Sequence, residues 1–146
     1  MEDHPIRFFE ESVEAFLFIP DFKRLRQVIR AVMDDFHCQL KSLNVVFLDD
    51  EQLRQINQDF LQHDYYTDII TFNLSEEAKV IEGELYISLS RVVANAQHYN
   101  TQVKDELGRV VIHGVLHLGG LTDKADDQVE EMRRLESHYL NHLNAN

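Results

Sequence analysis

Two histidines and an aspartate in one apolar, glycine-containing segment constrain this chain more than any other feature. The segment reads His-Gly-Val-Leu-His-Leu-Gly-Gly-Leu-Thr-Asp and runs from His113 to Asp123. Histidines four residues apart on a helix lie on one face, with Cβ atoms roughly 5–6 Å apart. Glycine just past a helix lets the chain turn in a left-handed conformation. We therefore predict a helix ending near Leu118 and a metal site formed by His113, His117 and Asp123.

The residue types of this segment indicate a catalytic metal site. Three protein ligands leave a fourth tetrahedral position for water, as in catalytic zinc sites and unlike structural ones. Zinc fits neutral imidazole nitrogen and carboxylate oxygen, although nickel, cobalt or manganese accept the same donors. One carboxylate leaves the ion with one formal positive charge and makes it a weaker Lewis acid than three histidines would. Sites of two histidines and one carboxylate still support hydrolysis. The pattern predicts a hydrolase with one zinc ion, in which the metal's water is the only catalytic group identified.

Two comparisons narrow this hypothesis. In H-E-x-x-H metalloproteases a glutamate after the first histidine is the general base; Gly114 stands at that position here, which argues against a peptidase. His138 and His142 are also four residues apart, but no glycine turn and third ligand follow them. Spacing alone therefore does not define a site.

Length and composition bound the class of protein. A chain of 146 residues is predicted to form one domain, residues 1–146. Its net charge of −12 argues against broad binding to nucleic acid, and we expect no DNA partner. Cys38 is the single cysteine, so a disulfide within the chain is impossible and a reducing cytoplasm is expected. The acidic start does not resemble a signal peptide, and apolar runs near ten residues are too short for a bilayer, so no membrane partner is expected.

The hydrophobic periodicity predicts an α+β domain with about four strands in a mixed sheet, about five helices, and the metal-binding helix near the centre. The expected strands are 6–11, 43–48, 67–72 and 84–88. The expected helices are 21–37, 49–60, 90–99, 101–118 and 126–143.

Four blocks of the sequence resemble the YbeY family of endoribonucleases, whose C-terminal motif is H-G-x-L-H-L-x-G-Y-D-H. The positions that match this motif are His113, Gly114, Leu116, His117, Leu118 and Gly120. The family pattern L-N-x-x-[YF]-R, followed by T-D-V-L-S-F, corresponds to residues 56–61 and 67–72. The pattern G-D-I-x-I-S corresponds to residues 83–88, and M-x-x-x-E to Met132 and Glu136. The resemblance covers the chain from about Leu43 to its end.

The resemblance implies a single-strand-specific endoribonuclease that acts in maturation of the 3′ end of small-subunit ribosomal RNA and in late ribosome quality control. It implies single-stranded RNA, ribosomal RNA and the small ribosomal subunit as partners, and it carries the metal ligands onto His113, His117 and Asp123. Asp123 stands where the family has histidine, and Leu61 where it has arginine. The loss of that arginine favours an alternative, a ribosome-associated binding module whose metal is mainly structural.

Four further residues are candidates for supporting roles. Arg109, one helical turn before His113, is a candidate for substrate binding in place of the missing arginine, the alternative being an ion-paired or solvated side chain. Asp68 is a candidate to hydrogen-bond a ligand imidazole and fix its tautomer, the alternative being a cap of the strand end. Tyr65 and Tyr66 could stack on bases or pack against the sheet edge.

Overall fold

The computed structural model describes residues 5–11 and 20–144. The elements in this part of the chain are β1 (Ile6–Glu10), α1 (Phe22–Asp35), β2 (Gln39–Leu48), α2 (Asp50–Leu61), β3 (Ile69–Asn73), β4 (Val80–Ser88), α3 (Leu89–Tyr99), α4 (Val103–Leu118) and α5 (Asp126–Asn144). The predicted α+β class, with one four-stranded mixed sheet and five helices, is confirmed. No helix in residues 5–11 or 20–144 is long and apolar enough to cross a membrane.

The strands lie in the order β1-β2-β4-β3, with β3 at one edge of the sheet. β1 pairs with β2 and β2 with β4 in parallel, whereas β3 and β4 are antiparallel. β2 and β4 both begin earlier than predicted, because Gln39 pairs with Val80 and Leu40 with Ile81 at their shared start. The first four residues of β2 have exposed or partly exposed side chains, whereas in β4 Ile81 and Gly83 are buried between partly exposed neighbours. The start of β2 therefore has no buried apolar residue to mark it, and pairing with β4 defines where both strands begin.

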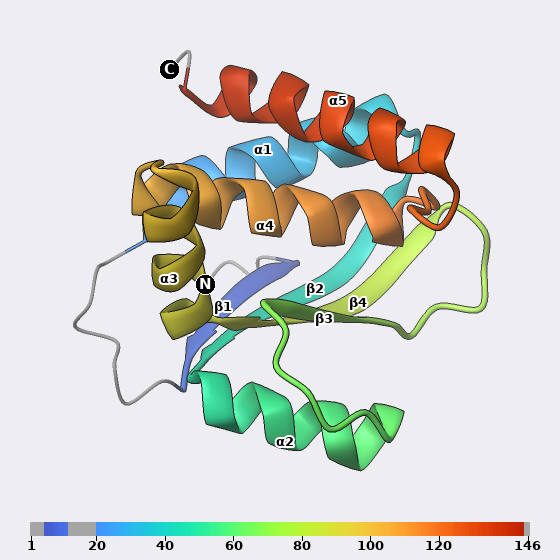
Figure 1. Ribbon diagram of the computed structural model, residues 1–146. Coiled ribbons are helices and arrows are strands. Elements are labelled where there is room, and N and C mark those ends of the chain that lie inside the picture. Colours follow the sequence, from blue (N-terminus) through green and yellow to red (C-terminus); the bar gives the residue numbers. More distant parts are fainter. Residues whose placement is uncertain (1–4, 12–19, 145–146) are drawn as a thin grey trace.

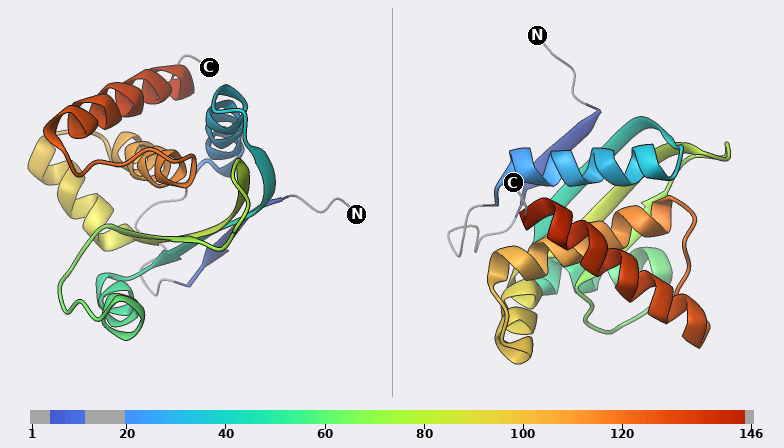
Figure 2. Two further views of the ribbon diagram at one scale, coloured as in Figure 1. Left: turned by 90° about the vertical axis from the view of Figure 1, so that its right-hand side faces the viewer. Right: turned by 90° about the horizontal axis from the view of Figure 1, so that it is seen from above.

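The two faces of the sheet carry very different amounts of helix. α1, α3, α4 and α5 lie on one side and α2 alone lies on the other (Figures 1 and 2). Successive side chains of β2 point to opposite faces of the sheet. Val45 belongs to the large core under α1 and α4, and Leu48 belongs to a small cluster under α2. α4 is the most enclosed helix and contacts α1, α3, α5, β3 and β4. The metal-binding helix predicted near the centre of the fold is thus confirmed.

Two glycines allow α4 to lie close to the sheet. A Cβ atom added at Gly114 would lie 2.7 Å from Ile69 Cδ1 and 2.9 Å from Leu85 Cδ2. A Cβ atom at Gly83 on β4 would lie 2.9 Å from both terminal carbons of Leu118. Real Cβ atoms do not approach other atoms this closely, so the helix and the sheet meet at these two positions. This contact fixes how far α4, and with it His113 and His117, lies from the edge of the sheet.

Candidate metal centre

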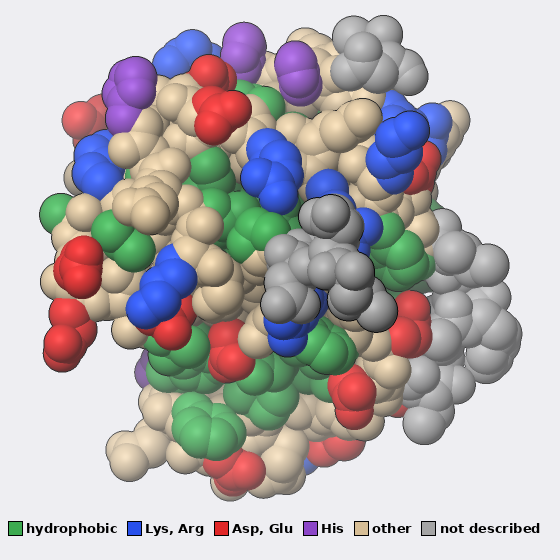
Figure 3. All heavy atoms as spheres, turned by 180° about the vertical axis from the view of Figure 1, so that it is seen from behind, with side chains coloured by type: hydrophobic (Ala, Val, Ile, Leu, Met, Phe, Trp, Pro, Cys, Tyr) green, Lys and Arg blue, Asp and Glu red, His purple; other side chains and the backbone are tan. Residues whose placement is uncertain are grey.

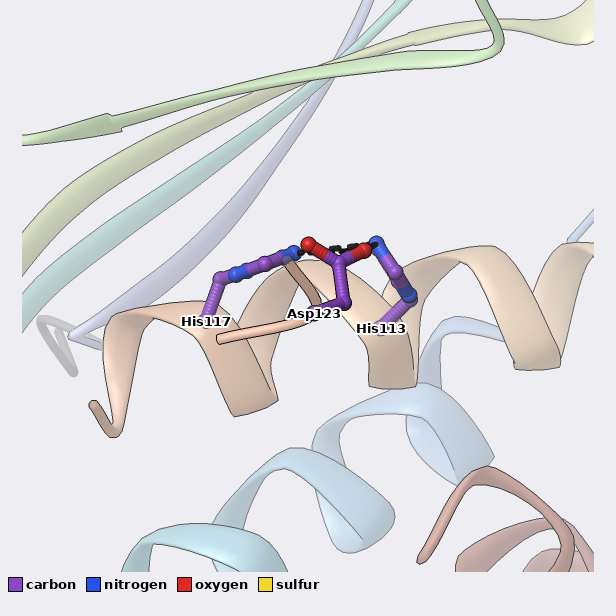
Figure 4. A group of neighbouring side chains, drawn as sticks. All are labelled: His113, His117 and Asp123. Atoms are coloured by element: carbon purple, nitrogen blue, oxygen red, sulfur yellow. Dashed lines mark hydrogen bonds and ion pairs between the residues drawn. The ribbon is translucent and has the colours of Figure 1, made fainter. Parts of the chain in front are cut away.

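The three side chains predicted as ligands converge in the structure (Figure 4). His113 Nε2 and His117 Nε2 are 3.1 Å apart. Asp123 Oδ2 lies 3.7 Å from His113 Nε2 and 3.6 Å from His117 Nε2. These side chains are 22%, 28% and 39% exposed, in the order His113, His117, Asp123, so solvent and ligands can reach them. Among the described residues, they form the one group of three His, Cys, Asp or Glu side chains close enough to hold a common ion.

The turn after α4 explains how Asp123 returns toward the helix. Gly120 N–H donates to His117 O at 3.0 Å and Leu121 N–H donates to Leu116 O at 3.0 Å. This pair of hydrogen bonds is the Schellman pattern of helix termination. Gly120 has φ of +106°, a conformation that favours glycine, whereas Gly119 keeps a helical φ of −75°. The left-handed turn predicted from the two glycines is therefore made by the second of them.

Both imidazoles are held through their Nδ1 atoms. His113 Nδ1 lies 2.6 Å from Oε2 of the buried Glu136 on α5, and His117 Nδ1 lies 3.0 Å from Leu121 O in the turn. A carbonyl and a carboxylate accept hydrogen bonds, which assigns the proton of each neutral ring to Nδ1. The Nε2 lone pairs are then free to bind an ion. Partners of this kind on the second nitrogen are usual for metal-binding histidines.

The donor atoms fit a divalent ion. Atoms bound to zinc at about 2.0–2.1 Å in a tetrahedral site lie roughly 3.3 Å from one another. The three separations found here are 3.1, 3.6 and 3.7 Å. Two lone pairs and a carboxylate oxygen at such short range repel one another unless a positive charge lies between them. His113, His117 and Asp123 could therefore hold zinc or a similar ion.

A network of buried carboxylates lies behind His113. Glu106 on α4 and Glu136 on α5 are 4% and 6% exposed, and the Arg109 guanidinium donates to both. Hydrogen bonding to Glu106 raises the pKa of Arg109. Burial raises the pKa of Asp68, whose Oδ2 lies 3.6 Å from Arg109 Nη2. One guanidinium thus lies among three carboxyl groups and supplies them with a positive charge, since an unpaired carboxylate is costly inside a protein.

Asp68 and Arg109, the two candidates for supporting roles, both belong to this network. The Asp68 carboxylate accepts from Asn95 Nδ2 at 3.3 Å and faces Arg109. Among the contacts of the described residues, Glu136 makes the imidazole hydrogen bond predicted for Asp68. Arg109 is surrounded by carboxylates and is absent from the pocket that contains the two ligand histidines, which favours its ion-paired alternative. Glu136 matches a family motif in the sequence, but the motif by itself indicates no contact with His113.

A pocket of about 460 Å³ adjoins the candidate metal centre, between α4, the edge strand β3 and the segment that joins α2 to β3. Its lining residues are Asn57, Leu61, His63, Tyr65, Thr67, Ile69, Ile70, Thr71, Asn73, His113, His117 and Leu118. Within this part of the described chain, the lining contains no Lys, Arg, Asp or Glu. The described lining therefore mixes polar and apolar side chains and places no fixed charge beside His113 and His117.

Comparison with known proteins identifies the family. Residues 18–144 match the family model described as Endoribonuclease YbeY. This chain belongs to the YbeY family. A YbeY relative from Cytophaga hutchinsonii is 43% identical over 140 residues, which are 96% of each chain. A relative from Amoebophilus asiaticus is 44% identical over 135 residues, 92% of this chain and 90% of its own. Both relatives are named Endoribonuclease YbeY.

A solved structure supports the same assignment at the level of the fold. The solution structure of TM1509 from Thermotoga maritima superposes with a TM-score of 0.67 and 28% sequence identity, covering 94% of this chain and 88% of that one. The resemblance to the YbeY family drawn from the sequence motifs is thus confirmed. The position at which those motifs have arginine is Leu61, and this side chain lies in the pocket beside His113 and His117.

Proposed function

We propose that this protein is a metal-dependent, single-strand-specific endoribonuclease that matures the 3′ end of small-subunit ribosomal RNA and acts in late ribosome quality control. In this proposal residues 1–146 form one catalytic domain, and His113, His117 and Asp123 bind one zinc ion. Its partners are single-stranded RNA, ribosomal RNA and the small ribosomal subunit, in the cytoplasm. Membership in the YbeY family, whose relatives are named endoribonucleases, supports the activity.

The observation that carries the proposal is the convergence of two Nε2 atoms and one carboxylate oxygen within 3.7 Å of one another. Each imidazole is oriented by a separate partner, a buried carboxylate for His113 and a backbone carbonyl for His117. Such prior orientation is what a catalytic metal site requires, because the ligands need not reorganise when the ion binds.

The residues of the chain have distinct parts in the reaction. When bound, a divalent ion supplies Lewis acidity, which lowers the pKa of water and polarises a phosphate oxygen. Glu136 and Leu121 O keep the protons of His113 and His117 on Nδ1, so that both Nε2 atoms remain donors. The pocket beside them offers neutral polar side chains, among them Thr71 and Asn73, to an RNA strand.

The surface charge agrees with a local mode of RNA binding. Acidic and basic side chains are interspersed over the face seen in Figure 3, and the net charge of the chain is −12. Sequence-independent affinity for nucleic acid depends on clustered Lys and Arg. We therefore expect binding to be directed by the pocket and the metal centre. In an RNA duplex the base faces are stacked and the Watson–Crick edges are paired, so a single strand is the substrate expected to enter the pocket.

The test is a cleavage assay on a single-stranded oligoribonucleotide, with the same sequence as a duplex for comparison. Protein loaded with zinc is compared with protein stripped by a chelator, and circular dichroism is recorded for both. We expect cleavage of the single strand by the loaded protein only, with the same helical signal in both samples. The large core under α1 and α4 does not include the three ligands, which is why the fold should survive removal of the ion.

The alternative, a binding module with a mainly structural metal, gives the opposite result. The chelator would then lower the unfolding temperature strongly, and the loaded protein would bind RNA without cutting it. Cleavage that is identical with and without the metal would contradict both forms of the hypothesis.

A further inference from the structure

The pocket beside the candidate metal centre contains a fixed pair of aromatic rings. His63 and Tyr65 are stacked, with ring centroids 5.2 Å apart and planes inclined by 19°. The Tyr65 hydroxyl and His63 Nδ1 are 3.0 Å apart and joined by a hydrogen bond. Both residues line the same pocket as His113 and His117. Tyr65 is nevertheless 54% exposed, so much of its ring is open to a ligand.

The segment that carries this pair is anchored to α2. Asn57, which is 2% exposed, donates from Nδ2 to Tyr65 O at 3.1 Å. Arg54 on the same helix forms an ion pair with Asp64, next to the pair in sequence. An aromatic surface that is already ordered loses little conformational entropy when a ligand stacks on it.

The neighbouring Tyr66 is exposed to a similar degree, 49%, but its contacts differ from those of Tyr65. The Tyr66 hydroxyl donates to Glu51 Oε2 at 2.9 Å. Its ring lies 5.5 Å from the Arg54 guanidinium and 5.4 Å from that of Arg91. Tyr66 is thus engaged by side chains of α2 and α3 and does not line the pocket. Of the two tyrosines, only Tyr65 faces the candidate metal centre.

The chemistry of the pocket favours a nucleobase over a phosphate at this pair. Within its described lining there is no Lys or Arg to bind a phosphate, and the position of the family's arginine is occupied by Leu61. Aromatic rings and neutral amides or hydroxyls are the groups that bind unpaired bases, by stacking and by hydrogen bonds to base edges. Asn73 and Thr71 on β3 supply such polar groups in the same pocket.

We propose that the His63–Tyr65 pair is a stacking surface for one unpaired base of the RNA strand, which places the neighbouring phosphodiester at His113, His117 and Asp123. The inference rests on the proposed endoribonuclease function and adds the means by which the substrate is positioned. Tyr65 is accordingly a positioning residue, and its contribution should appear in substrate binding.

The composition of the chain permits a direct measurement of stacking. The protein contains no tryptophan, so the Tyr65→Trp variant carries a single tryptophan at the proposed surface, whose fluorescence can be excited apart from that of the tyrosines. The ligand is an oligoribonucleotide whose 2′-hydroxyls are methylated, so that they cannot attack the phosphodiester. A base that stacks on the indole quenches the fluorescence of the tryptophan. Tyr99→Trp is the matched control, since Tyr99 is 61% exposed and lies outside this pocket. We expect saturable quenching in Tyr65→Trp and none in Tyr99→Trp.

Kinetics provide the second measurement. Loss of one stacking contact corresponds to roughly a tenfold weaker interaction, so Tyr65→Ala should raise KM about tenfold with little change in kcat. Tyr65→Phe keeps the ring and should restore most of the affinity. Replacing single nucleotides by abasic residues should reveal one position at which the wild-type protein loses affinity and Tyr65→Ala loses nothing further.

The outcomes separate this inference from the proposed function. If the wild-type protein cleaves RNA while Tyr65→Ala has an unchanged KM and Tyr65→Trp shows no quenching, the stacking surface is wrong and the endoribonuclease proposal stands. If the wild-type protein neither binds nor cleaves the oligonucleotides, both are wrong.

Discussion

Two helices of this protein carry histidine pairs with the same spacing, and only one pair forms a candidate metal centre. His113 and His117 on α4 have Nε2 atoms 3.1 Å apart and a carboxylate within 3.7 Å. His138 and His142 on α5 are exposed and belong to no group of potential ligands among residues 5–11 and 20–144. The same helical geometry therefore gives different results in the two places.

The difference lies in what surrounds each pair. The α4 pair is backed by Glu136 and by the Leu121 carbonyl, and it is followed by a turn that brings Asp123 toward the imidazoles. The α5 pair lies in the last turns of α5, which runs to Asn144 at the end of the described chain. A metal site thus depends on orientation of the second ring nitrogens and on a third ligand as much as on the spacing of two histidines.

Removal of one histidine from each pair tests most directly whether the α4 pair binds metal and the α5 pair does not. His117→Ala should abolish zinc binding, because two remaining ligands hold an ion poorly. His138→Ala, the matched variant on α5, should keep about one ion per chain. Metal content is measured by elemental analysis after gel filtration. Equal zinc content in the two variants would show that the converging side chains are not the ligands.

The carboxylate behind His113 is the next test. Glu136→Gln removes the charge that fixes the imidazole and should weaken zinc binding about 10- to 100-fold, measured by competition with a chelating dye. Glu131→Gln is the control, since Glu131 is on the same helix and forms an ion pair with Arg134 at the surface. Unchanged affinity in Glu136→Gln would mean that the α4 pair does not need its buried partner.

Substitution of the two glycines after α4 tests whether the turn contributes to zinc binding. Gly120→Ala forces a side chain into a φ of +106° and should cost about 1–2 kcal/mol of unfolding free energy. Zinc affinity should fall by about tenfold, because Leu121 O and Asp123 lose their places. Gly119→Ala keeps a helical φ of −75° and should affect zinc binding much less. Equal affinities in these two variants would exclude the turn as a determinant of the site.

The smallest expected effect concerns Asp68, whose network has no counterpart at the described α5 pair. Burial raises the pKa of Asp68 in the folded protein, so the unfolded chain loses this proton at lower pH than the folded one. The free energy of unfolding should therefore decrease as pH rises from the ordinary carboxyl range to the raised pKa. Asp68→Asn should flatten this decrease, as measured by urea unfolding at several pH values. An identical pH dependence in both proteins would contradict the assignment.

Much of the fold follows from local patterns in the sequence. The helix α4 ends at Leu118 as predicted, because the apolar periodicity stops at two glycines. The starts of β2 and β4 were placed too late, since Gln39 and Val80 are held by pairing with each other. Such pairing joins residues far apart in the chain and leaves no local signal.

The candidate site likewise contains features that local sequence predicts and features that depend on contacts between distant segments. The three candidate ligands are predicted together, because histidine spacing and a glycine turn are local features. The hydrogen bond between Glu136 and His113 joins α5 to α4 and could be found only from their packing. The motif around Asp68 makes that residue a candidate for the same hydrogen bond, with a strand-end cap as the alternative, but in the structure Asp68 faces Arg109. The partner of His117 is the backbone carbonyl of Leu121, and a backbone acceptor cannot be predicted from the residue type.

The close packing at Gly114 limits the chemistry that this fold can acquire. An added side chain at this position would press on the terminal carbons of Ile69 and Leu85, so a glutamate between the two histidines would require these side chains to repack where α4 meets the sheet. A single substitution that introduced the glutamate of a zinc peptidase would therefore carry a packing cost at the centre of the fold. The contact that brings the helix close to the sheet thus leaves no space for the proton acceptor of that motif.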